Sequence, residues 1–214
     1  MSIPSVIAAG VCITRNLIKR TAMKGSHNSW TYLRPRRLWM YLIAWTARCQ
    51  RYSIPEQYVD DTKCFDLRVK FDKLGNMVIA HGLVKYKYTD TQLMQDLQWL
   101  SAVSSHYIPV YVRVLHEVRN KRELNHSSQM CFRRFCDNLV KRFPGITFFG
   151  GNNLVDGSVD YDFGTNVTIE DAYASVACPK IGWWPWLYAR FNNKKNLSKK
   201  TDKDVVFVDF VDIE

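Results

Sequence analysis

The chain has 214 residues, of which 47% are hydrophobic and 14% aromatic, and its formal net charge is +10. This composition is sufficient for a sizeable hydrophobic core and excludes a mainly disordered chain. The positive charge favours an anionic partner, which could be nucleic acid, phospholipid headgroups or a phosphorylated substrate.

Two apolar runs are too short to cross a bilayer. The run IPSVIAAGVCI (3–13) has no basic residue before it, unlike a signal peptide, and LWMYLIAWTA (38–47) lies between RPRR and RCQR. We therefore expect no signal peptide and no transmembrane segment, and a protein that is cytoplasmic or peripherally bound to a membrane. We interpret 38–47 as part of a buried or interfacial helix.

Short β-branched and aromatic runs alternate with longer stretches that suit helices, as in an α/β protein with a parallel sheet. Strands are predicted at the approach to GSHNS and at 62–71, 76–80, 107–115, 146–151 and 204–212. Helices are predicted at 36–48, at 89–105 with Thr89 or Asp90 as the cap, and at 127–143, which ends before Pro144-Gly145. The sequence has no internal repeat and no linker, so we expect residues 1–214 to form one domain.

The basic segment NNKKNLSKKTDK (192–203) precedes the last predicted strand. We interpret it as a solvated loop, and contact with an anionic surface is the alternative.

The six cysteines contain no CxxC pair, and the spacing of Cys131 and Cys136 suits no common zinc knuckle. We expect mostly free and buried thiols at Cys12, Cys49, Cys64, Cys131, Cys136 and Cys178.

Polar residues stand where several predicted strands stop. His27 follows the first strand, Asp66 and Arg68 lie late in the second, His81 follows the third and Asp209 lies in the last. In a barrel of parallel strands these ends converge on one face, which predicts a common site. Each residue also has a structural alternative: a satisfied histidine, an Asp66–Arg68 ion pair or a plain turn at His81.

On four stretches the sequence resembles the catalytic X region of phosphatidylinositol-specific phospholipase C. They are KGSHNSW (24–30), AWTARCQRYSIPEQYVDDTKCFDLRV (44–69), IAHG (79–82) and VVFVDF (205–210). The family patterns that these stretches resemble are G-[ST]-H-[DN]-S, Q-x-x-S-I-x-x-Q with R-x-F-D-[IL]-R, H-G, and the last strand with its aspartate. The resemblance implies a TIM-type (β/α)8 barrel, compact or irregular with shortened helices, because the chain is short for that fold.

The resemblance also implies an activity. A phosphodiesterase of this type cleaves phosphatidylinositol, or a related inositol phosphodiester, into diacylglycerol and a cyclic inositol phosphate, as a hydrolase or lyase. It gives His27 the role of general base, His81 that of general acid and Arg68 that of phosphate clamp. Asp209 would orient His27, and Asp66 would fix Arg68.

Substrate contacts are expected from Asn28, Arg113 and Lys180. Asn28 departs from the bacterial enzymes, which usually have aspartate there to support the acid histidine, so His81 is expected to be a weaker acid. A catalytically weakened or inactive phosphoinositide-binding module is therefore the alternative function. Nucleic-acid binding is a further alternative from the charge, but no recognised motif supports it.

The predicted chemistry needs no cofactor and no metal. Calcium-dependent members of the family place acidic ligands on the second and fourth strands, where this chain has Arg68 and Leu115. A guanidinium carries a fixed positive charge and a planar fork that suits phosphate, so it can replace the cation, as in the bacterial branch.

A lipid substrate requires contact with a membrane, and Trp183, Trp184 and Trp186 in GWWPW (182–186) are the expected contacts. The alternative is that these tryptophans pack in the core or at the barrel rim. RPRRLW (34–39) is a second candidate for anionic headgroups. The remaining histidines, His106, His116 and His126, match no family pattern and are expected to be structural or exposed.

Overall fold

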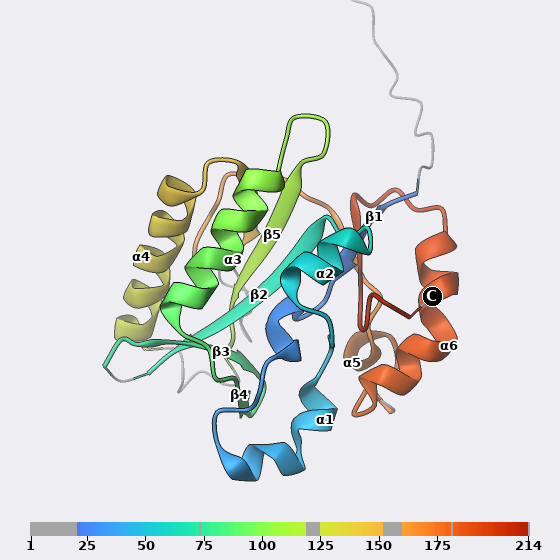
Figure 1. The fold of residues 1–214 in the computed structure, drawn as a ribbon, viewed down its shortest axis with the longest axis horizontal. Coiled ribbons are helices and arrows are strands. Elements are labelled where there is room, and N and C mark those ends of the chain that lie inside the picture. Colours follow the sequence, from blue (N-terminus) through green and yellow to red (C-terminus); the bar gives the residue numbers. More distant parts are fainter. Residues whose placement is uncertain (1–20, 73, 119–124, 152–159, 181, 214) are drawn as a thin grey trace, which may run out of the picture.

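The computed structural model describes residues 21–72, 74–118, 125–151, 160–180 and 182–213. The apolar run 3–13 and Cys12 lie outside the described residues. Within the described ranges, strands form one curled sheet (Figure 1). Its parallel strands are β1 (Met23–Ser26), β2 (Cys64–Phe71), β5 (Val110–His116), β6 (Ile146–Gly150), β7 (Ile169–Asp171) and β8 (Val205–Val208).

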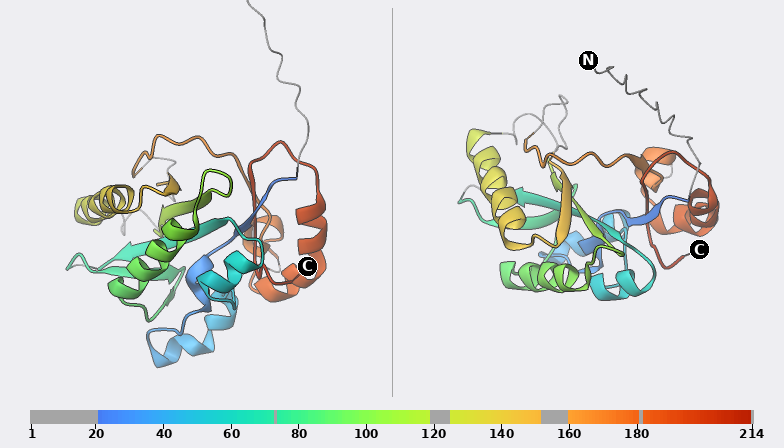
Figure 2. Two further views of the ribbon diagram at one scale, coloured as in Figure 1. Left: turned by 45° about the horizontal axis from the view of Figure 1, so that its top comes forward. Right: turned by 90° about the horizontal axis from the view of Figure 1, so that it is seen from above.

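These parallel strands are ordered β6-β5-β2-β1-β8-β7. Among the residues that the structure describes, β6 and β7 stand at opposite edges and do not pair, so the sheet is an open half-barrel (Figure 2). The expected closed (β/α)8 barrel is thus seen only in part, because six parallel strands are fewer than the eight that close such a barrel.

The third predicted strand, at 76–80, was expected to be parallel to the others, and in the structure it is antiparallel. β3 (Met77–His81) pairs antiparallel with β2 and continues into β4 (Val84–Lys85). A parallel return needs a crossover of a dozen or more residues, and the connection here is a tight turn. Asp72 stabilises that turn, because its Oδ1 accepts from the backbone N of Leu74 and of Asn76, both at 2.9 Å.

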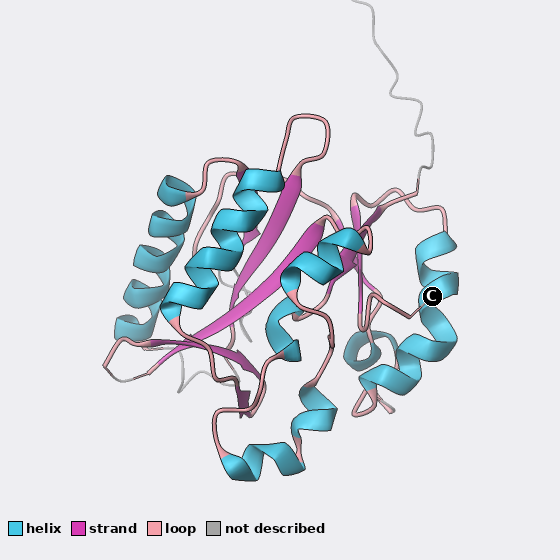
Figure 3. Ribbon diagram, in the orientation of Figure 1, coloured by secondary structure: helices cyan, strands magenta, loops and turns pink. Residues whose placement is uncertain are grey.

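Three helices pack on β2, β5 and β6 (Figures 1 and 3). They are α2 (Ile54–Val59), α3 (Asp90–Val103) and α4 (His126–Arg142). α3 and α4 begin at side-chain caps, since Thr89 Oγ1 accepts from Gln92 N at 3.2 Å and Asn125 Oδ1 from Ser128 N at 2.9 Å. Residues spaced for one helix face are buried against the strands: Leu93, Leu97, Leu100, Phe132, Cys136 and Leu139. The helices predicted at 89–105 and 127–143 are confirmed.

The helix predicted at 36–48 is instead two short pieces, η2 (Leu38–Leu42) and α1 (Ala44–Ala47). No side chain caps either piece, and only Met40 and Ala47 are buried. A helix needs a packed apolar face to be stable, and this run has apolar residues on all sides. Of its two interpretations, the structure excludes the buried helix.

The segment 192–203 is only partly the loop that its composition predicts, because residues 192–198 are helical and residues 199–203 are not. Two helices lie beside β1 and β8, namely α5 (Ala174–Ala177) and α6 (Pro185–Ser198), and α6 includes the first part of this segment. Asn193 is buried in α6 and its Nδ2 donates to the carbonyl groups of Asp209 at 2.7 Å and Phe210 at 3.0 Å. These hydrogen bonds to the residues after β8 satisfy the buried amide nitrogen of Asn193, so this polar residue fits within the helix.

The five cysteines in the described ranges are free, as predicted. Cys49, Cys64 and Cys136 are buried, whereas Cys131 and Cys178 are partly exposed. In the same ranges no helix has the length and apolar character needed to cross a bilayer.

Candidate active site

Both edges of β2 are occupied, and this positions the two motif histidines. One edge pairs with β5, from Cys64 to Val69. The other edge pairs with the end of β1, where Ser26 lies opposite Phe65, and further along with β3, where Ile79 lies opposite Val69. β1 and the antiparallel β3 therefore run toward each other along the same edge.

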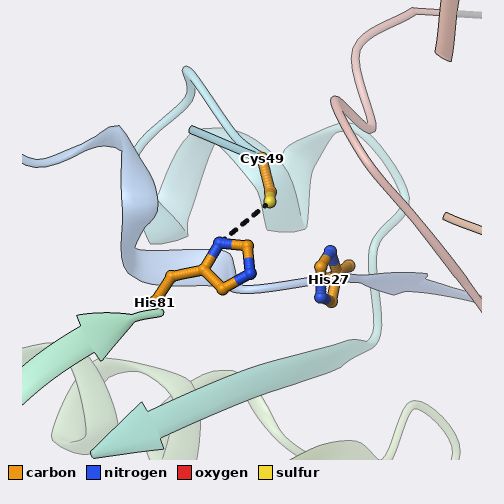
Figure 4. Close-up of side chains that lie close together, drawn as sticks. All are labelled: His27, Cys49 and His81. Carbon is orange, nitrogen blue, oxygen red and sulfur yellow. Dashed lines mark hydrogen bonds between the residues drawn. The ribbon is translucent and has the colours of Figure 1, made fainter. Parts of the chain in front are cut away.

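His27 follows β1 and His81 ends β3, so the two imidazoles meet in the gap between these strands (Figure 4). Their ring centroids are 5.5 Å apart, and the rings are nearly perpendicular, at 86°. Asp66 and Arg68 lie on the part of β2 that borders this gap. The structure thus brings together the residues that the sequence placed at strand ends, although His81 arrives by a hairpin.

His27 is buried, and polar groups hold both of its ring nitrogens. Nδ1 lies 2.7 Å from Asp209 Oδ1, and Nε2 lies 2.9 Å from the amide nitrogen of Asn28. An amide NH2 only donates, so we assign the proton to Nδ1 and a lone pair to Nε2. Asp209 is itself held by Ala174 N, which donates to its Oδ2 at 3.1 Å.

Asn28 is buried in a left-handed conformation, with φ at 48° and ψ at 55°. It precedes a 3-10 turn, η1 (Ser29–Tyr32), and its backbone N donates to Asp66 Oδ2 at 3.1 Å. Its side chain contacts His27, and none of its described contacts is with His81. The sequence-based expectation that this position supports the acid histidine therefore finds no contact in the described structure.

The side chain of His81 is fixed from one side. Its Nδ1 lies 3.0 Å from the carbonyl oxygen of Ala47 and 3.6 Å from Cys49 Sγ. The hydroxyl of Tyr86 donates to the same carbonyl at 3.0 Å. Nδ1–H is the natural donor to Ala47, which leaves Nε2 toward His27 (Figure 4).

Tyr173 lies flat against His27, with ring centroids 3.5 Å apart and planes 2° from parallel. Arg68 reaches the same residue, because its Nη2 donates to the Tyr173 hydroxyl at 3.4 Å. Tyr173 thus joins His27 to Arg68. Sequence reasoning missed it because no matched motif covers this part of the chain.

Two buried arginines share the carboxylate of Asp66. Arg68 Nε donates to Oδ2 at 2.9 Å and Arg113 Nε to Oδ1 at 3.0 Å. Arg113 also donates to Asp171 at 2.8 Å, and Arg68 lies 3.5 Å from Glu117. Burial alone would raise the pKa of Asp66, but the charges of the two arginines outweigh burial and lower that pKa below its usual value.

Both histidines have lowered pKa values. Burial lowers the pKa of His27 well below its ordinary value of 6.5, although Asp209 acts in the opposite direction. Burial and then the charge of Arg68 lower the pKa of His81 below 6.5, with Glu117 opposing them. In the free protein, both imidazoles are therefore more easily neutral than an exposed histidine.

A pocket of about 390 Å³, in the size range of small-molecule sites, opens beside Arg68 and Tyr173, and neither His27 nor His81 is among the residues that line it. Its polar lining comes from Arg68, Arg113, Thr165, Asn166, Asp171 and Tyr173, and the Leu115 side chain lines it without offering an oxygen. The sequence also predicted Lys180 as a substrate contact. That residue is exposed and does not line this pocket.

Two glutamines of the motif stretch 44–69 hold the strand ends together. Gln50 Nε2 donates to the carbonyls of His27 at 3.0 Å and of Val208 at 3.1 Å, which ties the ends of β1 and β8. Gln57 Nε2 donates to the carbonyl of Ser29 at 2.8 Å. Both side chains are buried, so their role here is to position the chain that carries His27 and Asp209.

Aromatic side chains from two distant segments meet at the surface. Trp45 of α1 lies edge-on to Trp184, with ring centroids 5.3 Å apart. The exposed large hydrophobic side chains of the two segments, which we together call the aromatic face, are Leu38, Trp39, Tyr41, Leu42, Trp45, Trp183, Trp184 and Trp186. Trp183 and Trp184 are 67% and 54% exposed, so the alternative in which they pack in the core is wrong.

The described residues offer few free ligands for a metal ion. The carboxylates of Asp66, Asp171 and Glu117 are paired with arginines, which disfavours a hard cation such as Ca²⁺ in the pocket. A different group, His27, Cys49 and His81, has one ligand atom from each residue within 4.8 Å of the others (Figure 4).

The other histidines lie apart from this site. His116 is buried, with Nδ1 2.8 Å from Asp160 Oδ2 and its ring stacked on Phe132 at 5.0 Å. His106 and His126 are exposed. The expectation that these three are structural or exposed agrees with their positions.

Comparison with known proteins identifies the fold. No family model and no curated protein matches the sequence. The structure is similar to phosphatidylinositol-specific phospholipase C from Listeria monocytogenes, with a TM-score of 0.58, 15% identity, and coverage of 90% of this chain and 89% of that one. The chain has the fold of the bacterial phosphatidylinositol-specific phospholipases C.

Two mutant forms of the enzyme from Staphylococcus aureus are also similar. Their TM-scores are 0.57 and 0.55 at 11% and 12% identity, over 90% and 88% of this chain and 87% and 84% of theirs. The resemblance read from the motifs is thereby confirmed as a likeness of fold.

Proposed function

We propose that the protein is a phospholipase C-type phosphodiesterase that cleaves phosphatidylinositol or a related inositol phosphodiester. The products are diacylglycerol and a cyclic inositol phosphate. The observation that carries this proposal is the meeting of His27 and His81 at one edge of β2, beside Arg68 and a pocket of about 390 Å³. Two imidazoles and a guanidinium supply the base, the acid and the positive charge that the reaction needs.

His27 acts as the general base. The inositol hydroxyl next to the phosphate replaces the Asn28 amide at Nε2 and gives its proton to that nitrogen as its oxygen attacks phosphorus. Asp209, at 2.7 Å from Nδ1, holds the required tautomer and stabilises the imidazolium that forms. The nucleophile belongs to the substrate, so the protein needs no serine or cysteine nucleophile.

His81 acts as the general acid, and Arg68 stabilises the phosphoryl charge. The bond from phosphorus to the diacylglycerol oxygen breaks, and that oxygen takes the proton from His81. Contacts of the Arg68 terminal nitrogens with Glu117 and Tyr173 are long, at 3.5 and 3.4 Å. These nitrogens can therefore turn to the phosphate oxygens while Nε stays on Asp66.

Turnover is expected to need no metal ion, because Arg68 supplies the positive charge and arginines hold the nearby carboxylates. Phosphatidylinositol vesicles incubated with the protein in excess EGTA and EDTA should release water-soluble inositol phosphate at the rate seen without chelator. Release that stops in chelator and returns with Ca²⁺ would overturn the metal-independent mechanism.

The optimum of kcat/KM is expected below pH 6.5. The base must be neutral, so activity rises as pH passes upward through the pKa of His27, which is lowered. The acid must be protonated, so activity falls as pH passes upward through the pKa of His81, which is also lowered. A profile measured from pH 4 to 9 with a soluble inositol phosphodiester checks this, and an optimum above pH 7 contradicts it.

The aromatic face is proposed to dock on a membrane. Its large side chains suit the boundary between lipid and water, and the exposed Arg34, Arg36 and Arg37 next to it suit anionic headgroups. One similar structure, of the Staphylococcus aureus enzyme, is described as concerning the modulation of its membrane binding.

A Trp45→Ala/Trp184→Ala double variant is expected to bind anionic vesicles at least about tenfold more weakly, about 1.4 kcal/mol. Both rings are about half exposed, so their removal should leave the fold intact. Co-sedimentation with phosphatidylinositol-containing vesicles measures the affinity. Tyr107→Ala is the matched control, because Tyr107 is exposed in the turn between α3 and β5, far from α1 (Figure 1). Equal binding of both variants removes the aromatic face from consideration.

A second candidate function is a phosphoinositide-binding module without turnover. Asn28 favours it, because the amide occupies the Nε2 lone pair that the base must use. Vesicle binding without release of inositol phosphate, across the pH range above, would support this candidate over the enzyme.

A further inference from the structure

We propose that His27, Cys49 and His81 bind a thiophilic divalent cation such as Zn²⁺, and that this cation blocks the reaction. Only the block of the reaction rests on the proposed function. Cation binding itself follows from the positions of the three side chains and holds for an enzyme or for an inactive module. Cys49 is the member that the proposed mechanism leaves without a role.

The distance between Cys49 and His81 already fits a bound zinc ion. In tetrahedral coordination with Zn–S of about 2.3 Å and Zn–N of about 2.0 Å, sulfur and nitrogen lie about 3.5 Å apart. Cys49 Sγ and His81 Nδ1 are 3.6 Å apart. Nδ1 would give up its hydrogen bond to Ala47, whose carbonyl keeps the Tyr86 hydroxyl at 3.0 Å. The exchange therefore leaves no buried carbonyl without a partner.

His27 has the surroundings of a metal-binding histidine. Its Nδ1–H points to a carboxylate, Asp209 at 2.7 Å, which is the support commonly found behind a ligating imidazole. Its other nitrogen carries the lone pair, now held by Asn28. One nitrogen of each histidine and the Cys49 sulfur lie within 4.8 Å of one another, so closure around one ion requires a shift of about 1 Å. With Nε2 of His27 as the ligand, the Asn28 amide must also leave that nitrogen.

The charges of the site suit a soft ion. A Cys49 thiolate and the Asp209 carboxylate offset the two positive charges of the cation, while the nearby charge of Arg68 is paired with Asp66 and Glu117. Burial raises the pKa of the Cys49 thiol, so the free protein carries it as a neutral group and cation binding releases its proton. A thiolate with two imidazoles selects zinc-like ions over Ca²⁺ and Mg²⁺.

Occupation of the site removes the lone pair that the base needs. The ion takes Nε2 of His27, which can then accept no proton from the inositol hydroxyl. It also takes Nδ1 of His81 and holds that ring against Cys49, where the two already lie 3.6 Å apart. Zinc-like ions therefore act as inhibitors, and Cys49 gives the site its selectivity.

Titration with Co²⁺ tests the site without any turnover. We expect the full-length protein to gain an intense near-ultraviolet absorption, from charge transfer between thiolate and cobalt, that Zn²⁺ abolishes by displacement. Cys49→Ser should lose this band and bind Zn²⁺ at least about 100-fold more weakly, since removal of even an outer-shell partner costs 10–100-fold. Cys178→Ser is the matched control and keeps the band, because Cys178 is outside the group.

The proposal is overturned if the wild-type protein shows no charge-transfer band, or if the band survives Cys49→Ser. Circular dichroism checks that the variants are folded. If Cys49→Ser does not fold, His81→Gln is used in its place, because it keeps the thiol and is also expected to bind Zn²⁺ more weakly than the wild type. Inhibition by Zn²⁺ is then measured for the wild type, Cys49→Ser and Cys178→Ser, each against its own rate without Zn²⁺. A band without inhibition removes the blocking role and leaves the binding site, whereas absent turnover with a clear band rejects the proposed enzyme and keeps the binding site.

Discussion

Replacing His27 by alanine is expected to lower kcat for phosphatidylinositol cleavage by about 10²- to 10⁴-fold, the usual contribution of a general acid or base. The loss follows from the missing Nε2 lone pair, which leaves no acceptor for the inositol proton. Binding to vesicles should not change, because His27 is buried and the aromatic face is intact. Release of inositol phosphate from vesicles in chelator measures the effect.

The His27→Ala variant also leaves a space that imidazole can fill. Added imidazole is expected to restore part of the rate, which a purely structural histidine would not allow. His106→Ala is the matched control, since His106 is exposed and apart from the site. A His27→Ala protein that is folded and retains the wild-type rate would rule out this residue as the base.

Replacing Arg68 by alanine is expected to lower kcat by about 10²- to 10³-fold and to destabilise the fold by about 3 kcal/mol. The rate falls because the phosphoryl oxygens lose their positive partner. Stability falls because Glu117 and one side of Asp66 lose a buried ion pair, although Arg113 still holds Asp66 at 3.0 Å. Urea unfolding gives the stability and the vesicle assay gives the rate.

Arg68→Lys separates the two roles of this residue. Lysine keeps the positive charge beside Asp66, so much of the stability should return. It lacks the planar fork that binds two phosphate oxygens while Nε remains on Asp66, so kcat should stay low. If Arg68→Lys regains the full rate and Arg68→Ala loses only stability, then Arg68 is a structural ion-pair partner and the mechanism needs another clamp.

The motifs predicted which residues come together, and the order and direction of the strands explain why. His27 and Asp209 directly follow β1 and β8, and Asp66 lies inside β2, so the three residues are on adjacent parallel strands. The sequence also predicts that His81 joins these residues, but it implies a parallel strand before His81, whereas β3 is antiparallel to β2. A β-branched run does not reveal the direction of its strand. The direction comes from the turn at Asp72, which is too tight for a crossover.

Other parts of the site had no signal in the sequence. Tyr173 and Glu117 come from the stretch that matches no motif, and a lone tyrosine or glutamate has no pattern that identifies it. Cys49 lies inside a motif stretch, but a single cysteine does not indicate its neighbours. Composition also gave wrong predictions at 36–48 and 192–198, because burial of a few side chains, such as Asn193, decides whether those residues are helical.

The segments around Trp45 and Trp184 have a consequence for how this protein can diverge. Ala47, two residues after Trp45, holds His81, and α5, which separates Tyr173 from Trp184, begins at the Ala174 amide that holds Asp209. The turn at Asp72, by contrast, lies at the far end of the hairpin from His81. Under the proposed function, mutations at that turn leave the site unchanged, whereas changes in the segments around Trp45 and Trp184 that alter membrane contact also disturb the groups that hold His81 and Asp209. The two traits are therefore expected to evolve together.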